Sequence, residues 1–166
     1  MSRWINEAQA PKGVFIQNCQ IASCSTGGIK LNGTVSQTKI LGNTLSIISG
    51  GSQIGIYLRS ADGLLGNNLI SDVLIQGNNI SQEGATPGTG VLMEAIDSPP
   101  GGFNGSVKHI TITGNNVSNF NNGVDRITYT GAAVDYINVS TNNLNRNTTP
   151  VNNIIGIGNN IVSNNT

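Results

Sequence analysis

The stretch Val73-Leu74-Ile75-Gln76-Gly77-Asn78-Asn79-Ile80 has near-copies along the whole chain. In each copy, apolar residues alternate with other residues, then a two-residue corner follows, then one more residue and a final apolar residue. The six copies span Val14–Ile21, Thr38–Leu45, Val73–Ile80, Ile110–Val117, Ile137–Leu144 and Ile154–Ile161. A repeat of this kind predicts a solenoid, in which each unit buries its apolar face against its neighbours.

The corner of each copy predicts how the coils stack. Alternation on both sides indicates two short strands that meet at a sharp bend, where Gly and Asn tolerate the left-handed conformation. The second corner position holds Cys19, Asn43, Asn78, Asn115, Asn142 and Asn159. In coils about 4.8 Å apart, these amides would hydrogen-bond in a column, so we expect an Asn ladder. General richness in Asn does not explain this fixed register.

A second signal follows each corner, a Gly that leads a run of alternating apolar residues. It occurs at Gly28-Ile29-Lys30-Leu31, Gly55-Ile56-Tyr57-Leu58, Gly90-Val91-Leu92-Met93 and Gly123-Val124. Each coil should therefore contain three strands, two beside the Asn corner and a third after Gly, in about 20–25 residues. The longer second and third intervals predict inserted loops at 60–72 and 94–108.

Together these signals predict an all-β fold, a parallel β-helix of about six rungs and three sheets over residues 14–166. Residues 1–13 do not fit the template and would form either a cap or the edge of a longer protein. Gly156 takes a core position and 145–153 lacks a Gly-led strand, so we expect an irregular C-terminal end. The predicted interior comprises Val14, Ile16, Ile21, Ile29, Leu31, Ile40, Leu45, Ile56, Leu58, Val73, Ile75, Ile80, Val91, Met93, Ile110, Ile112, Val117, Val124, Ile137, Val139 and Leu144.

The amino-acid composition fits an all-β solenoid and argues against nucleic-acid-binding and membrane proteins. Charged residues make up 10% of the chain, aromatic residues 4%, and 22 of 166 residues are Gly, which suits short strands and tight turns. Eight basic residues balance eight acidic ones, so we expect no nucleic-acid or membrane partner. The sequence has no run of about 18 apolar residues, and we expect neither a membrane span nor a signal peptide. Cys19 and Cys24 are expected to be free thiols.

The Asn corner, the Gly-led strand and the three-strand coil resemble the right-handed parallel β-helix of the pectin-lyase-like superfamily, including phage tailspikes. The resemblance covers residues 14–161. It implies that the Gly-led strands form a sheet whose outer face borders a saccharide groove. The same fold hosts lyases, hydrolases, epimerases and adhesins, so it indicates no single activity. The Gly-His-Gly and Asp-Asp motifs of polygalacturonases and the Arg-x-Pro-x-x-Arg run of pectate lyases are absent.

Outward positions on the Gly-led sheet supply the candidate site. The predicted substrate-binding residues are Lys30, Tyr57, Arg59 and Asp125, with Tyr57 as the platform for a sugar ring. The predicted catalytic residues are Asp62, Glu94 and Asp97. Two carboxylates about 5 Å apart suit a retaining glycosidase, and facing loop carboxylates also suit Ca²⁺, the one cofactor considered.

Plainer interpretations exist for the same residues. Arg59 and Glu94 fall at equivalent positions of adjacent coils, where a solvated salt bridge is common. Aspartates in Gly- and Pro-rich loops often serve as turn formers, which is the alternative for Asp62 and Asp97. His109, the only histidine, is expected to be a surface or loop-packing residue.

Three functions are compatible with the sequence. The first is a tailspike-like segment on the virion surface that binds, and in an enzymatic form depolymerises, bacterial surface polysaccharide. Its outward apolar residues Phe15, Leu41, Leu74 and Ile155 would then pack in a homotrimer. The second is an extracellular lyase, hydrolase or epimerase that uses Arg59 and the three carboxylates. The third is a structural or adhesive solenoid without catalysis.

Overall fold

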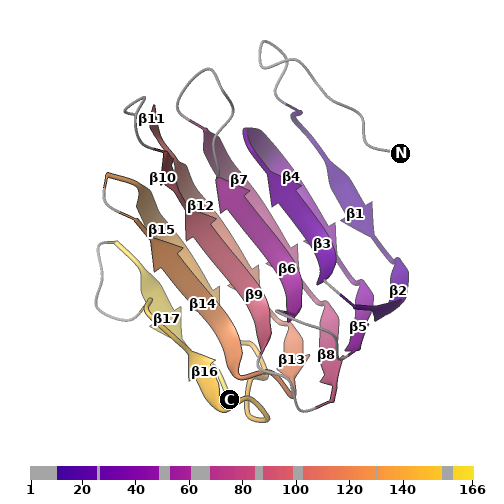
Figure 1. Cartoon of the computed structure of the whole chain (residues 1–166). Helices are drawn as coiled ribbons and strands as arrows, with labels where there is room; N and C mark the ends of the chain where they lie inside the picture. Colours follow the sequence, from indigo (N-terminus) through magenta and orange to yellow (C-terminus); the bar gives the residue numbers. More distant parts are fainter. Residues whose placement is uncertain are drawn as a thin grey trace.

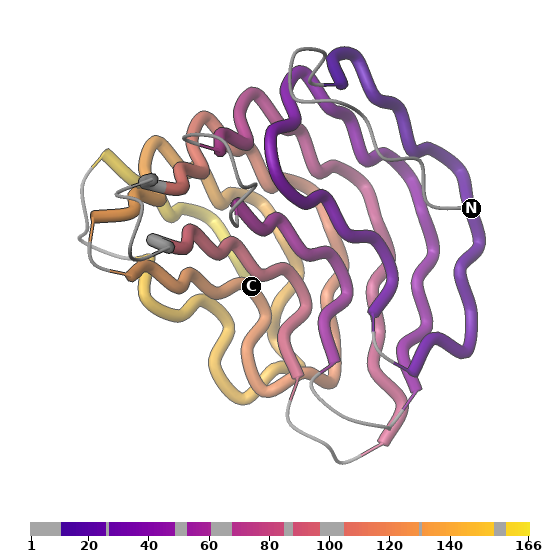
Figure 2. The backbone as a smooth tube through the Cα atoms, turned by 45° about the horizontal axis from the view of Figure 1, so that its top comes forward, coloured from indigo at the N-terminus to yellow at the C-terminus, as the bar shows by residue number. Residues whose placement is uncertain are grey.

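The computed structural model describes residues 11–25, 27–48, 53–60, 68–84, 88–98, 103–129, 131–154 and 159–166. Every regular element in these ranges is a β-strand, and most of the strands form three parallel sheets (Figure 1). The chain winds through successive coils from one end to the other (Figure 2). The predicted all-β parallel solenoid is thus confirmed, with five coils and one strand of a sixth. No helix in the described ranges is long and apolar enough to cross a membrane.

Each sheet takes one strand from successive coils. Sheet A, before the Asn corner, contains β1 (Phe15–Gln17), β4 (Val35–Leu41), β7 (Leu69–Gln76), β12 (Ser106–Thr113), β15 (Ala133–Ser140) and β17 (Ile161–Ser163). Sheet B, after the corner, contains β2 (Gln20–Cys24), β5 (Thr44–Ile48), β8 (Asn79–Glu83) and β13 (Asn116–Ser118). Sheet C, the Gly-led sheet, contains β3 (Gly27–Asn32), β6 (Gln53–Ser60), β9 (Gly88–Ala95), β14 (Asn122–Thr128) and β16 (Thr149–Val151).

The core is a set of aliphatic columns that run along the solenoid axis. One column in sheet A stacks Ile16, Ile40, Ile75, Ile112, Val139 and Val162 in register. The predicted interior residues are buried, except for Val14, Ile16 and Ile21 of the first coil. These three are partly buried because a described coil covers them on one side only.

The Asn ladder forms as expected through most of its length. The ladder residues are Asn43, Asn78, Asn115, Asn142 and Asn165, and each Oδ1 accepts hydrogen bonds of 2.9–3.0 Å from the corner residue one coil earlier. Cys19 takes part only through its backbone N–H, which donates to Asn43. Both cysteines are free.

The prediction that residues 154–161 form the last copy is wrong. Ile161 pairs with Asn138 of β15, so the final strand of sheet A begins where the predicted copy ends. Asn165 therefore holds the ladder position, while Asn159 donates to the exposed carboxylate of Asp135. In the register set by β15, Ile161 is exposed and Val162 packs against the core. Ile155 and Gly156 lie outside the described residues.

The glycines of sheet C are required by close packing between coils. Gly28, Gly55, Gly90 and Gly123 occupy one column. A Cβ atom on Gly55 would lie 2.5 Å from the Gly90 carbonyl oxygen and 2.5 Å from Cγ2 of Ile80. The fifth coil keeps its third strand without glycine, because Pro150 of β16 takes this place between Thr149 and Val151.

The connections after sheet C are shorter than the predicted loops. Residues 69–72 and 106–108 belong to β7 and β12, which extend sheet A beyond the template. In the second connection, β10 (Asp97–Ser98) and β11 (Phe103–Asn104) form a small antiparallel pair. The described strands therefore leave only short segments between sheet C and sheet A.

Candidate functional site

The outer face of sheet C brings together the predicted binding residues in columns along the solenoid. Parallel pairing in register places equivalent side chains of successive coils next to one another. The three outward columns are Ile54, Thr89, Asn122 and Thr149; Lys30, Tyr57, Leu92 and Asp125; and Asn32, Arg59, Glu94 and Ile127. The five predicted site residues that belong to sheet C thus share one face: Lys30, Tyr57, Arg59, Glu94 and Asp125.

Four of these side chains form a contact network, which we call the Tyr57 cluster: Lys30, Tyr57, Arg59 and Glu94. Arg59 and Glu94 are neighbours, as expected, with 3.2 Å between Nε and Oε2. The Tyr57 hydroxyl donates to the same carboxylate oxygen. The ammonium of Lys30 lies over the Tyr57 ring, 5.2 Å from its centroid, which is a cation–π contact.

The electrostatics of the cluster keep Tyr57 protonated. Burial of the phenol raises its pKa well above the usual range, and its hydrogen bond to Glu94 and the charge of that carboxylate act in the same direction. Only 10% of the Glu94 side chain is exposed, and one of its oxygens accepts from two neighbours. This geometry suits a fixed structural carboxylate better than a proton donor to a substrate.

Asp125 lies in the same face but is satisfied internally. Only 6% of the surface of Asp125 is exposed. Oδ2 accepts from Nδ2 of Asn122 at 2.9 Å, and Oδ1 accepts from the Asn153 amide and the Arg126 backbone N–H at 3.1 and 2.7 Å. Asp125 therefore joins adjacent coils and organises the edge of the site, and it has little capacity left for direct contact with a ligand.

The other two predicted catalytic carboxylates do not enter the described geometry. Asp62 lies outside the described residues. Asp97 is described only as backbone, paired with Asn104 in the β10–β11 hairpin. Catalysis by these residues, and a Ca²⁺ ion held between them, stay predictions. The structure describes no cluster of three His, Cys, Asp or Glu side chains suited to a metal within the ranges given above.

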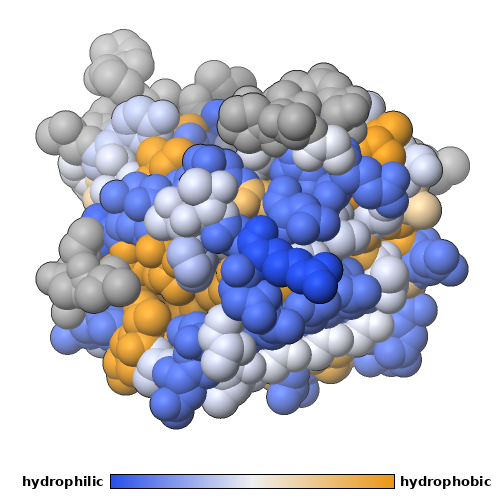
Figure 3. Space-filling view, turned by 90° about the horizontal axis from the view of Figure 1, so that it is seen from below, coloured by the Kyte–Doolittle hydropathy of each residue, from blue (hydrophilic) through white to orange (hydrophobic). Residues whose placement is uncertain are grey.

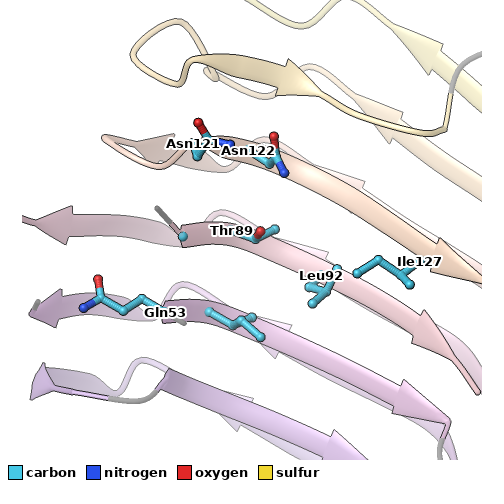
Figure 4. Close-up of a pocket in the computed structure, with 8 residues that line it drawn as sticks. Gln53, Thr89, Leu92, Asn121, Asn122 and Ile127 are labelled. Atoms are coloured by element: carbon cyan, nitrogen blue, oxygen red, sulfur yellow. The ribbon is translucent and has the colours of Figure 1, made fainter. Parts of the chain in front are cut away.

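A shallow open hollow of about 250 Å³ adjoins the Tyr57 cluster (Figure 4). It crosses β6, β9 and β14 and is lined by Gln53, Ile54, Gly88, Thr89, Leu92, Asn121, Asn122 and Ile127. Leu92 and Ile127 lie close together in it and pair in register with Tyr57 and Glu94 of the cluster. The hollow thus combines apolar side chains with the accessible amides of Asn121 and Asn122 and the hydroxyl of Thr89, and none of its lining residues is charged.

Ile127 and Tyr129 were missed by sequence reasoning. The alternation that places Asp125 outward continues to Ile127 and Tyr129. The Gly-led strand expected from the sequence, however, was recognised only at Gly123-Val124. Tyr129 follows β14 directly, is 50% exposed, and lies near enough to Tyr57 to influence its ionisation electrostatically. A full in-register alignment with β9 would have found both residues, since Ile127 pairs with Glu94.

A second group of side chains lies on the bend near the start of the sheet A strands. Gln37, Asp72, His109 and Tyr136 occupy one column and all have φ of 54–56°. His109 Nδ1 lies 3.4 Å from Oδ1 of Asp72, and the His109 and Tyr136 ring centroids are 5.1 Å apart. These side chains are exposed, as expected for His109.

Apolar exposure is confined to a few places on the described surface. Seen from below, where sheet B lies, the molecule shows mainly hydrophilic and intermediate side chains with smaller hydrophobic areas (Figure 3). The large hydrophobic side chains that are most exposed are Phe15, Tyr129, Tyr136 and Ile161. Phe15 and Ile161 stand in one outward column of sheet A.

Comparison with known proteins adds no relative: no family model, no curated protein and no solved structure matches the chain. The parallel solenoid and its Asn ladder therefore rest on the chain's own sequence and geometry.

Proposed function

We propose that the outer face of sheet C binds a bacterial surface polysaccharide, and that the chain is a segment of a tailspike-like protein on a virion or in the extracellular space. The observation that carries this proposal is the uncharged hollow that adjoins the Tyr57 cluster. The two lie on one continuous face that spans four successive coils. A polymer laid across the strands would contact both.

The chemistry of the hollow matches a sugar ring. A pyranose presents hydroxyl groups at its edge and C–H groups on its faces. Asn121 and Asn122 carry amides that both donate and accept hydrogen bonds. Leu92 and Ile127 supply the apolar surface that a C–H face requires. The half-exposed ring of Tyr129, at the edge of the same face, offers a further stacking surface.

The described carboxylates support binding more than cleavage. Glu94 is held by Tyr57 and Arg59, and Asp125 accepts three hydrogen bonds from its surroundings. Neither stands free beside the hollow as a general acid or nucleophile requires. Depolymerisation, in a lyase or hydrolase, would have to depend on Asp62 and Asp97.

The test uses an array of capsular and O-antigen polysaccharides, with and without Ca²⁺. Thr89→Arg would fill the hollow, so we expect it to weaken binding about tenfold or more. The matched control is Thr44→Arg, which places the same side chain at an exposed position of β5 in sheet B. Equal binding by both variants would exclude the hollow as the site. Loss of polymer size during incubation would show that binding is accompanied by cleavage.

Association into a homotrimer is the second part of the proposal. Phe15 and Ile161 are each 59% exposed on the outer face of sheet A, and Leu74 lies in the same column. Burial of this column between chains would remove apolar surface from water. Light scattering at high concentration should give the trimer mass, and Phe15→Ser should lower it. A strict monomer would exclude the trimer without affecting the glycan site.

A further inference from the structure

Charge on the outer face of sheet C is separated by depth. The two acidic residues are buried, with Glu94 8% and Asp125 6% exposed. The two basic residues reach solvent, since Lys30 is exposed and 34% of the Arg59 side chain is accessible. Although the formal charges cancel, the part of this face that a ligand meets is cationic.

Free hydrogen-bonding capacity follows the same division. Arg59 uses Nε for Glu94, and among the described residues its Nη1 and Nη2 groups have no partner. Lys30 contacts the Tyr57 ring and pairs with no described carboxylate. The acceptors on Asp125 are both engaged, and Glu94 already accepts from two donors. The cluster therefore offers spare charged donors around an aromatic ring.

The geometry points to an acidic saccharide as the ligand of the Tyr57 cluster, with its carboxylate bound by Arg59 and Lys30 and an uncharged neighbouring sugar in the hollow. A guanidinium presents paired donors that match a carboxylate, and hydrogen bonds between charged groups are about twice as strong as neutral ones. This inference rests on the proposed function, which requires only that some polysaccharide binds.

Local contacts, not a long-range field, would produce the selectivity. The chain has no net charge at pH 7, so it would not attract every polyanion. Discrimination would instead come from one or two charge pairs at the Tyr57 ring. We therefore expect moderate weakening of binding as salt increases, because partly exposed pairs are screened.

Each acidic capsular or O-antigen polysaccharide is placed on an array. Beside it stands the same polymer after its carboxyl groups have been reduced to alcohols. The wild-type chain should bind the native form about tenfold more tightly than the reduced form. Lys30→Gln should remove most of this preference, because it removes a charge that distinguishes the native form from the reduced one. Arg59→Gln is less suitable, since it would leave the buried Glu94 without its cationic partner.

The matched control is Lys39→Gln. The ammonium of Lys39 lies over the Phe15 ring at 5.4 Å on the outer face of sheet A, almost the same contact as that of Lys30 with Tyr57 at 5.2 Å. This control should keep the full preference for the native polymers, with its mass checked by light scattering because Lys39 lies in the sheet A column proposed for the trimer. Equal binding of native and reduced forms, or equal effects of both lysine variants, would overturn the inference while the proposed function stands. Binding to no polymer would overturn both.

Discussion

Asn78 and Asn115 are joined by two hydrogen bonds across adjacent coils, because Oδ1 of Asn115 accepts from both the backbone N–H and Nδ2 of Asn78, each at 2.9 Å. Nδ2 of Asn78 also donates to the Ile40 carbonyl at 2.9 Å. One side chain thus connects three consecutive coils. Since both Asn residues are 1% exposed, these groups have no access to water if a partner is lost.

Asn115→Ala should therefore strongly destabilise the solenoid. It removes the acceptor of the two Asn78 donors and leaves Oδ1 of Asn142 without its side-chain donor. We expect a loss of about 2–4 kcal/mol in the free energy of unfolding, measured by urea denaturation. The control is the adjacent Asn116→Ala, which removes an exposed amide that donates to Asn79 and should cost about 0.5 kcal/mol or less. Similar losses for both would contradict a structural role of the ladder.

Cys19→Asn should extend the ladder by one amide. The backbone N–H of Cys19 already donates to Asn43 Oδ1 at 3.0 Å, so the new Nδ2 would meet the same acceptor. The expected gain is about 0.5–1 kcal/mol in the free energy of unfolding. Cys19→Ala, which removes the thiol without adding an amide, should show no gain. A gain of equal size in both variants would attribute the effect to loss of the thiol.

Gly90→Ala tests the close approach of sheet C to sheet B. An added Cβ atom would collide with Cγ1 of Val117 and lie 2.6 Å from the Gly123 carbonyl oxygen. Because a backbone atom cannot move aside alone, we expect a loss of about 3 kcal/mol in thermal or urea unfolding. In the control, Gly77→Ala, the new Cβ has nothing within 4 Å and only the φ of +66° opposes it, so the loss should be about 1 kcal/mol. The reverse order would contradict the packing explanation.

Alkaline pH should weaken the Tyr57 cluster. The pKa of Tyr57 is raised above its ordinary value by burial and by Glu94, so its contribution to stability is complete below the unfolded-state pKa of about 10 and is lost as pH rises further. Phenolate absorbance should show a late component from Tyr57. Tyr57→Phe should remove this component and lessen the loss of stability at high pH. A late component that persists in this variant would assign it to another tyrosine.

Much of the fold follows from local sequence patterns. The alternation of apolar residues selects strands, and the recurrence of Asn and Gly at fixed offsets requires identical corners to stack. The sequence read in isolation misplaces the last copy. Residues 154–161 match the whole eight-residue template, whereas residues 161–165 match only a part of it. Pairing of Val162 with Val139 decides between them, and such pairing is a relation between coils.

The sequence by itself determined the coil, the ladder from Asn43 to Asn142 and the neighbours Arg59 and Glu94, because each depends on a constant register of short strands. Only the tertiary structure decided which charges are buried, that Ile127 and Tyr129 share the face, and that a hollow adjoins Tyr57. These properties depend on how adjacent coils cover one another. Side-chain contacts between coils, unlike strand periodicity, have no signature in any single repeat.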